Sequence, residues 1–232
     1  MTSSRHFALI PAAGAGTRMR IECPKQYLSI LGKTVLMHVL DTLTSSKAVT
    51  HTFIVVSNGD GYIDDALANA QHLDGKITIV RNGGDTRHLS VRNGLKAMRE
   101  HVDDSDWVMV HDAARPGLTL ALIDKLVTAL NGDTVGGLLA VPIVDTLKRA
   151  DGAGRVQATI PRERVWAAQT PQMFRYALLC RALEHAGQVT DEASAIESLG
   201  LHPKLVEGSP RNFKITKVED ISLAKYYLEG NS

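Results

Sequence analysis

Long apolar runs, paired cysteines and a surplus of charge are all missing from this sequence of 232 residues. No stretch approaches the roughly 20 apolar residues that a helix needs to cross a bilayer, so we expect a soluble protein without membrane contact. Its two cysteines, Cys23 and Cys180, form no CxxC pair, and the N-terminal apolar run is too short for a signal peptide. A reducing, cytoplasmic location therefore fits the sequence best.

The formal net charge is only +1, so the chain lacks the broad basic field of proteins that wrap nucleic acid. Nine histidines are present, but none stands in an HxH or HExxH spacing, which argues against a zinc site. Any anion that the protein binds must therefore be met by a few locally placed Arg and Lys side chains.

Hydrophobic residues make up 44% of the sequence, enough for one sizeable core and a single domain over 1–232. Uncharged or nearly uncharged apolar runs occur at 7–11, 52–57, 76–80 and 107–111, and helical patterns separate them at 34–46, 60–72 and 87–101. This alternation predicts an α/β fold with a doubly wound, mostly parallel, Rossmann-like sheet.

The alternation of strands and helices is interrupted at 143–168, a polar segment with Asp-Gly and Gly-Arg turn signals. We interpret it as a protruding β-hairpin arm, which has too little core to be stable alone in water. It should therefore pack on a second copy of the chain, giving a homodimer. Beyond a helix at 119–131 and an apolar run at 135–142, we expect helices at 174–187, 191–199 and 218–228 and strands at 204–207 and 213–216.

A glycine-containing loop, PAAGAGTRM at 11–19, follows the first strand and would let a polyphosphate approach the backbone closely. Met19 stands where a dinucleotide fingerprint needs glycine, and no acid follows the second strand, so an NAD-dependent oxidoreductase is disfavoured. Two cations, Arg18 and Lys25, follow the glycines, with Pro24 stiffening the approach to Lys25. Either cation alone could be a surface charge, but the combination is typical of a triphosphate site.

Asp112, in the segment HDAARP, follows the fourth strand at the edge of the sheet where ligands of α/β proteins bind. One carboxylate there is sufficient for Mg²⁺, because substrate phosphates and waters supply the other ligands, although Asp112 could simply cap the next turn. Arg115 could steady Asp112 or form an ordinary surface ion pair. The loop at 82–87, with Ser90, suits a base or ribose, or is only a turn before a helix.

Several motifs in one order resemble the 2-C-methyl-D-erythritol 4-phosphate cytidylyltransferase family nearly from end to end. They are PAAGAGTRM, ECPKQYL, GGDTRHLSV, HDAARP, VDTLKRA, TPQMF, TDEASA and LVEG with NFKIT. The resemblance implies an enzyme that transfers the cytidylyl group of CTP to 2-C-methyl-D-erythritol 4-phosphate with the help of Mg²⁺ and releases pyrophosphate. A cytidylyltransferase for another polyol phosphate, such as ribitol 5-phosphate, and a non-catalytic nucleotide-binding regulator are the alternatives.

The resemblance also implies a role for each matching residue. The triphosphate would be held by Ala12, Ala13, Gly14, Gly16, Arg18 and Lys25, and the cytidine would lie among Gly84, Asp85, Ser90 and Ala113. Asp112 would carry Mg²⁺. The acceptor would be held by Asp112, Arg115, Thr170, Thr190 and Lys214, together with Thr146 and Arg162 from the arm of the partner subunit.

The nucleophile in such a reaction would be a phosphomonoester, which is mostly dianionic at neutral pH because its second pKa is about 6. No general base is then required, and the obstacle is repulsion between two anions. We therefore expect Arg18 and Lys25 to stabilise charge on the transition state and the leaving group. Lys214 and Arg162 are expected to aim the incoming phosphate.

Overall fold

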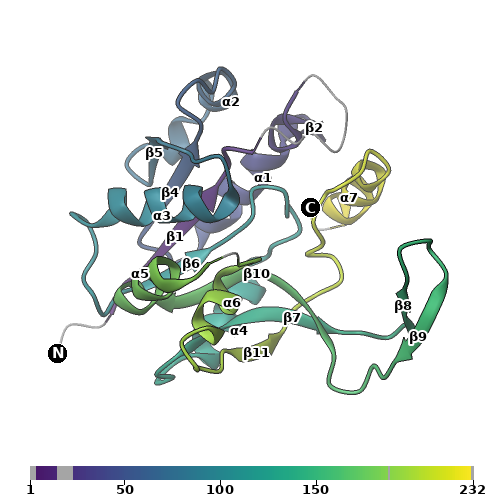
Figure 1. The fold of residues 1–232 in the computed structure, drawn as a ribbon. Helices are drawn as coiled ribbons and strands as arrows, with labels where there is room; N and C mark the ends of the chain where they lie inside the picture. The colour runs from purple at the N-terminus through teal and green to yellow at the C-terminus, as the bar shows by residue number, and fades with distance from the viewer. Residues whose placement is uncertain (1–3, 15–22, 188, 231–232) are drawn as a thin grey trace.

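The computed structural model describes residues 4–14, 23–187 and 189–230. Its central feature is a seven-stranded sheet with the order β11-β7-β10-β6-β1-β4-β5. The strands of this sheet are β1 (His6–Pro11), β4 (His51–Val56), β5 (Ile77–Arg81), β6 (Trp107–Val110), β7 (Gly136–Pro142), β10 (Trp166–Arg175) and β11 (Lys204–Glu207). Helices flank both faces of the sheet (Figure 1).

The helices are α1 (Val35–Ser45), α2 (Ile63–Leu67), α3 (Arg87–Met98), α4 (Leu120–Ala129), α5 (Tyr176–His185), α6 (Glu192–Glu197) and α7 (Asp220–Glu229). Over the ranges that the structure describes, the 3₁₀ turns η2 (Lys25–Tyr27) and η3 (Gln71–Leu73) and a small hairpin of β2 (Ser29–Ile30) and β3 (Lys33–Thr34) accompany these helices. Threonine hydroxyls cap α1, α3 and α4 by accepting a backbone N–H from the first turn. None of these helices has both the length and the hydrophobicity that a membrane crossing requires.

The sheet is mostly parallel, as predicted, because β1 pairs in parallel with both β4 and β6, and β4 with β5. β11 also runs parallel to β7, whereas β10 is antiparallel to β6 and β7. The residues of β1 explain its central place: Ala8, Leu9 and Ile10 are fully buried. A strand covered on both faces needs such an uninterrupted apolar run.

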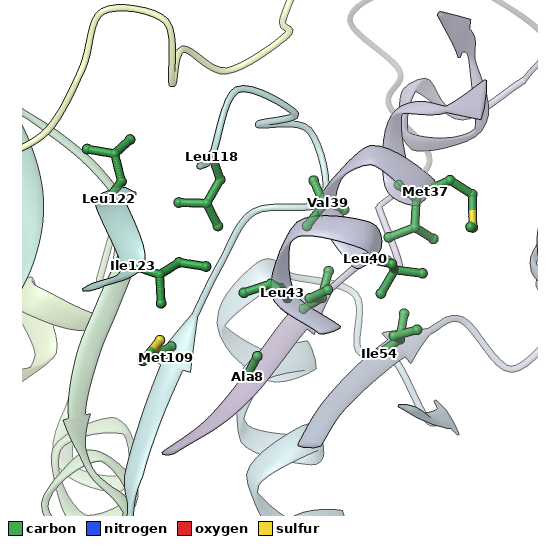
Figure 2. Close-up of a cluster of buried hydrophobic side chains, with 14 of the residues drawn as sticks. Ala8, Met37, Val39, Leu40, Leu43, Ile54, Met109, Leu118, Leu122 and Ile123 are labelled. Carbon is green, nitrogen blue, oxygen red and sulfur yellow. The ribbon is translucent and has the colours of Figure 1, made fainter. Parts of the chain in front are cut away.

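Two helical layers pack on opposite faces of the sheet, and the side chains of β1 alternate between them. Figure 2 shows one layer, in which Leu40 and Leu43 of α1 lie over Ala8, Ile54 and neighbouring strand residues. The other layer consists of α3, α5 and α6, against which Leu9 packs. Burial on both faces fixes the sheet and therefore the position of the loops that leave its carboxyl edge.

After β7 the chain leaves the sheet, forms a hairpin of β8 (Leu147–Ala150) and β9 (Val156–Ile160), and returns as β10. The hairpin projects away from the sheet and lies on the same side of the molecule as α7 (Figure 1). Most of its side chains are exposed, including Val156 at 66% of its surface. The predicted arm at 143–168 thus contains this hairpin, but its last three residues belong to β10.

Some predicted elements differ from the structure. The segment 213–216 is not a strand. Its alternating pattern reflects the burial of Ile215, whose backbone N–H donates to the Ala114 carbonyl oxygen at 2.9 Å. The helix expected at 60–72 is the short α2 followed by η3, and the helix expected at 174–187 begins only after β10 ends. The strand at 204–207 is confirmed with the same bounds.

Candidate functional site

A cavity of about 580 Å³ lies at the carboxyl edge of the sheet. Its lining residues lie at or after the ends of β1, β4, β5 and β6, or come from η2, the first turn of α3 and the loop before α7. They are Pro11, Ala12, Ala13, Gly14, Lys25, Gln26, Ser57, Gly83, Gly84, Asp85, Thr86, Arg87, Ser90, Asp112, Ala113, Ala114, Lys214 and Thr216. Because parallel strands end at one edge, loops distant in sequence meet there, as is usual for ligand sites of α/β proteins.

Gln26 connects the glycine loop to η2. Its side-chain amide nitrogen donates to the carbonyl oxygens of Ala12, at 2.8 Å, and Gly14, at 3.2 Å. The adjacent Lys25 donates from Nζ to the Ile215 carbonyl oxygen at 3.0 Å, so it lies between the glycine loop and the segment that carries Lys214. The predicted triphosphate residues Gly16 and Arg18 lie outside the described residues.

The second glycine loop is packed tightly against the first. A Cβ atom on Gly83 would overlap the Cβ atom of Ala13 in the first loop and come within 2.9 Å of the Val56 carbonyl oxygen, so a larger residue would not fit there. The hydroxyl of Ser90 accepts the N–H of Gly84 at 3.1 Å and donates to the Thr86 carbonyl oxygen at 3.0 Å. These contacts hold Gly84 and Ser90, both predicted to surround the nucleoside, at the cavity wall.

Asp112 is the centre of a cluster of charges on this wall and is only 6% exposed. Its Oδ1 accepts from Nε of Arg87 at 2.9 Å, and its Oδ2 lies 2.8 Å from Nζ of Lys214 and 3.5 Å from Nε of Arg115. Burial raises the pKa of Asp112, but the charges of Arg87, Lys214 and Arg115 lower it to well below its usual range. Asp112 is therefore a carboxylate at neutral pH.

Arg87 also pairs with a second buried acid, Glu192, which is 1% exposed. Its Nη1 and Nη2 donate to the two oxygens of Glu192 at 2.6 and 3.0 Å. Burial lowers the pKa of Arg87, but Glu192 and Asp112 raise it above its ordinary value, so the guanidinium stays charged. The geometry thus links two carboxylates through one arginine.

Neither Arg87 nor Glu192 was assigned a role from the sequence. A weak signal for Arg87 was available, because a basic residue in the first turn of a helix opposes the helix dipole, an effect that a partner acid would offset. Glu192 gave none, since an acid in the first turn of α6 needs no partner beyond the dipole. Gln26, inside the ECPKQYL motif, was likewise missed.

Thr170, predicted to contact substrate, lies behind Asp112 and is 4% exposed. Its hydroxyl accepts the N–H of Asp112 at 3.0 Å and lies 3.0 Å from Nδ1 of His111. The other ring nitrogen of His111, Nε2, lies 3.1 Å from the Arg115 carbonyl oxygen and must donate to it. Nδ1 of a neutral His111 can then accept the hydroxyl hydrogen of Thr170, and burial keeps the ring neutral by lowering its pKa to about 4.

We expect the protein to lose about 2 kcal/mol of unfolding free energy through His111 as the pH falls from 7 to 5. Burial lowers the pKa of His111 to about 4, whereas its unfolded value is about 6.5, so between these values the unfolded chain binds the extra proton. Urea unfolding of the wild type and of His111→Gln checks this. The stability difference between them should shrink by that amount at pH 5, and a constant difference would contradict it.

The other predicted acceptor residues do not line the cavity. Nη1 of Arg115 is bonded to the Asn212 carbonyl oxygen at 2.8 Å. Thr190 borders a separate cavity of about 330 Å³, which also has Arg87 and Glu192 in its wall. Thr146 and Arg162 lie in the segments that join the hairpin to β7 and β10, where Arg162 donates to the Val144 carbonyl oxygen. Within one chain, therefore, the acceptor residues are not all assembled.

The donor set suits a hard divalent cation that arrives with a polyphosphate. In the described parts of the chain, no three His, Cys, Asp or Glu side chains gather as a closed metal site. Asp85 and Asp112 are the acids among the residues that line the cavity. Mg²⁺ typically binds one or two carboxylates and takes its other ligands from phosphates and water, so these residues fit it.

Comparisons with known proteins point to one family over almost the whole chain. The family model described as 2-C-methyl-D-erythritol 4-phosphate cytidylyltransferase matches residues 6–230. Proteins with that name from Azoarcus sp. and Nitrosomonas eutropha are both 52% identical, over 98% and 97% of this chain and 96% and 97% of their own lengths.

Solved structures agree as well. A crystal structure of 4-diphosphocytidyl-2C-methyl-D-erythritol synthase is 40% identical, with a TM-score of 0.86 over 97% of this chain and 99% of its own. The Francisella tularensis 2-C-methyl-D-erythritol 4-phosphate cytidylyltransferase is 34% identical, with a TM-score of 0.83 over 97% of this chain and all of its own. The likeness thus extends to the architecture.

Proposed function

Because this chain belongs to the 2-C-methyl-D-erythritol 4-phosphate cytidylyltransferase family, we propose a mechanism in which its charged cavity brings together two anionic substrates. The enzyme transfers the cytidylyl group of CTP to 2-C-methyl-D-erythritol 4-phosphate, giving 4-diphosphocytidyl-2-C-methyl-D-erythritol and pyrophosphate. One observation carries the mechanism: Lys25, Lys214 and the Asp112 cluster border the same cavity as the glycine loop.

The acceptor phosphate is the nucleophile and attacks the α-phosphate of CTP, with the bond to pyrophosphate breaking. This phosphate is mostly dianionic at neutral pH, so the protein need not remove a proton from it. Lys214 lies beside Asp112 at the cavity wall and guides the incoming phosphate, while Lys25 and Arg18 stabilise the charge that develops on the leaving group. The backbone of Ala12, Ala13, Gly14 and Gly16 cradles the triphosphate, and Gly84, Asp85, Ser90 and Ala113 surround the cytidine.

Nucleotidyltransferases generally use a divalent metal, and we infer that here it is Mg²⁺ held by Asp112. The carboxylate of Asp112 is ionised and borders the cavity, so it can supply an oxygen ligand. When bound, the cation offsets the negative charge of the phosphates. Arg87 and Lys214 keep Asp112 oriented toward that position by holding its two oxygens.

The reaction is tested by incubating the protein with CTP, Mg²⁺ and 2-C-methyl-D-erythritol 4-phosphate and measuring pyrophosphate. Ribitol 5-phosphate serves as the matched acceptor control, since it is also a polyol phosphate. We expect pyrophosphate release with the methylerythritol substrate and a kcat/KM for ribitol 5-phosphate that is lower by roughly tenfold or more. Equal rates with both acceptors would contradict the acceptor assignment.

Lys25→Ala should lower kcat roughly 10²-fold, comparable to removing one donor from an oxyanion hole. The Nζ group of Lys25 lies at the cavity wall, 3.0 Å from the Ile215 carbonyl oxygen. A charge at this place acts mainly on the transition state, where negative charge shifts to pyrophosphate. Steady-state kinetics at saturating CTP measure the effect, and near-normal turnover would remove Lys25 from the mechanism. Lys25→Arg keeps the positive charge but changes the donor geometry, so its kcat shows whether the charge alone is sufficient.

We propose a homodimer in which the arm of each subunit completes the other subunit's site. The arm hairpin is exposed and has little core. Thr146 and Arg162, in the segments that join it to the sheet, do not line the cavity of their own chain. Thr146 and Arg162 would then hold the methylerythritol phosphate across the interface, together with Arg115, Thr170 and Thr190 of the other chain.

Mixing two inactive variants tests this arrangement. In a mixed dimer of Lys25→Ala and Arg162→Ala subunits, one site carries both substitutions and the other carries neither. We therefore expect activity to return after the variants are unfolded and refolded together, to about a quarter of the wild-type value for random pairing. If Arg162 served its own chain, each site would keep one defect and the mixture would stay inactive.

A further inference from the structure

Arg87 joins two buried carboxylates that belong to distant parts of the chain. Asp112 follows β6, whereas Glu192 begins α6, and their side chains are 9% and 1% exposed. The guanidinium uses Nε for Asp112 and both terminal nitrogens for Glu192. Glu192 itself does not line the CTP cavity.

Because Arg87 uses only one of its nitrogens for Asp112, the second oxygen of Asp112 can pair with Lys214. A guanidinium prefers to grip a carboxylate with two parallel N–H groups, and Glu192 takes that grip. Only Nε of Arg87 then reaches Asp112, at Oδ1, while Oδ2 lies 2.8 Å from Nζ of Lys214. Without Glu192, Arg87 would be free to grip both oxygens of Asp112 and to compete with Lys214.

We propose that Glu192 is a positioning residue for the transfer reaction, acting through Arg87 to fix the orientation of the Asp112 carboxylate. This role rests on the proposed function of Asp112 and adds a residue that does not line the CTP cavity. Because a fork-shaped donor pair fixes the plane of the guanidinium, the direction of its Nε–H is fixed as well. The buried setting strengthens these charge-assisted bonds.

The charge balance supports the same role. Arg87, Arg115 and Lys214 surround Asp112, so three cations would share a single carboxylate if Glu192 were neutral. Glu192 neutralises one of them. The neighbouring Asp191 cannot replace it, because its carboxylate caps α6 by accepting from Ser194 and also binds Gln172.

Glu192→Gln is the direct test, because it preserves shape and removes the charge and one acceptor. We expect kcat to fall roughly tenfold or more, as for other residues that orient a ligand, while KM for CTP changes less than threefold. Asp191→Asn is the matched control, one residue away in the same helix turn, and should keep kcat within twofold. Rates are expressed per folded molecule, measured by urea unfolding, so a purely structural role would leave kcat unchanged.

A second background shows whether Glu192 acts through Arg87. In Arg87→Lys the bidentate grip is already lost, so adding Glu192→Gln should cost no further kcat. A kcat for Glu192→Gln equal to that of Asp191→Asn, or a further tenfold loss in the Arg87→Lys background, would overturn the proposal. If Glu192→Gln does not fold, Glu192→Asp replaces it, with the same expected loss because its shorter side chain shifts the guanidinium. An inactive wild type would instead refute the proposed function itself.

Discussion

Asp112→Asn should lower kcat roughly 10²- to 10³-fold without unfolding the protein. The change removes the negative charge that Arg87, Lys214 and Arg115 surround, and with it the proposed ligand of the divalent cation. Several kcal/mol of transition-state stabilisation are expected to be lost, which corresponds to that range of rates. Asparagine keeps the size of the side chain and an oxygen acceptor, so the backbone contact with Thr170 should persist.

Steady-state kinetics at saturating CTP and Mg²⁺ measure this effect. Asp64→Asn provides a control, because Asp64 forms an exposed ion pair with Arg81 away from the cavity. We expect that control to keep its turnover. If the kcat of Asp112→Asn stayed within tenfold of the wild type, Asp112 could be neither the metal ligand nor the organiser of the cations.

Arg87→Met should destabilise the folded protein by about 3–5 kcal/mol, the usual cost of leaving one partner of a buried ion pair uncompensated. Among the described residues, Arg87 is the only Arg or Lys within ion-pair distance of Glu192, which is 1% exposed. Methionine retains much of the volume of arginine but offers no donor. Glu192 then stays buried without its cationic partner, which is costly for a charged group.

Urea unfolding at pH 7 measures the loss, and Arg81→Met is the matched control. Arg81 pairs with Asp64, whose side chain is 73% exposed, so its loss should cost less than about 1 kcal/mol. Combining Arg87→Met with Glu192→Leu should recover most of the stability, because both buried charges are then absent. Equal stability of Arg87→Met and Arg81→Met would show that the buried ion pair stabilises the fold no more than the exposed one.

Strand β10 was not predicted from the sequence, and its residues show why. Gln169, Thr170 and Gln172 are buried within it, so its apolar pattern is broken. Each polar side chain is satisfied by a distant partner: Gln172 by the N–H of Ala193, for example, and Thr170 by the N–H of Asp112. An apolar pattern predicts a buried strand only where the buried residues are hydrophobic. In β10, hydrogen bonds allow polar residues to be buried, so the pattern does not indicate the strand.

The sequence by itself determined the parallel core strands, because strands buried on both faces must be apolar throughout. It also determined the family, because the chain carries the family's motifs in the family's order. It also placed Asp112 and the glycine loops at the carboxyl edge of the sheet. Only the tertiary structure decided which charges meet there. Arg87 and Glu192 are 105 positions apart, and no local pattern fixes such a pair. Long-range packing brings β6, α3 and α6 together, and their contact determines the electrostatics of the site.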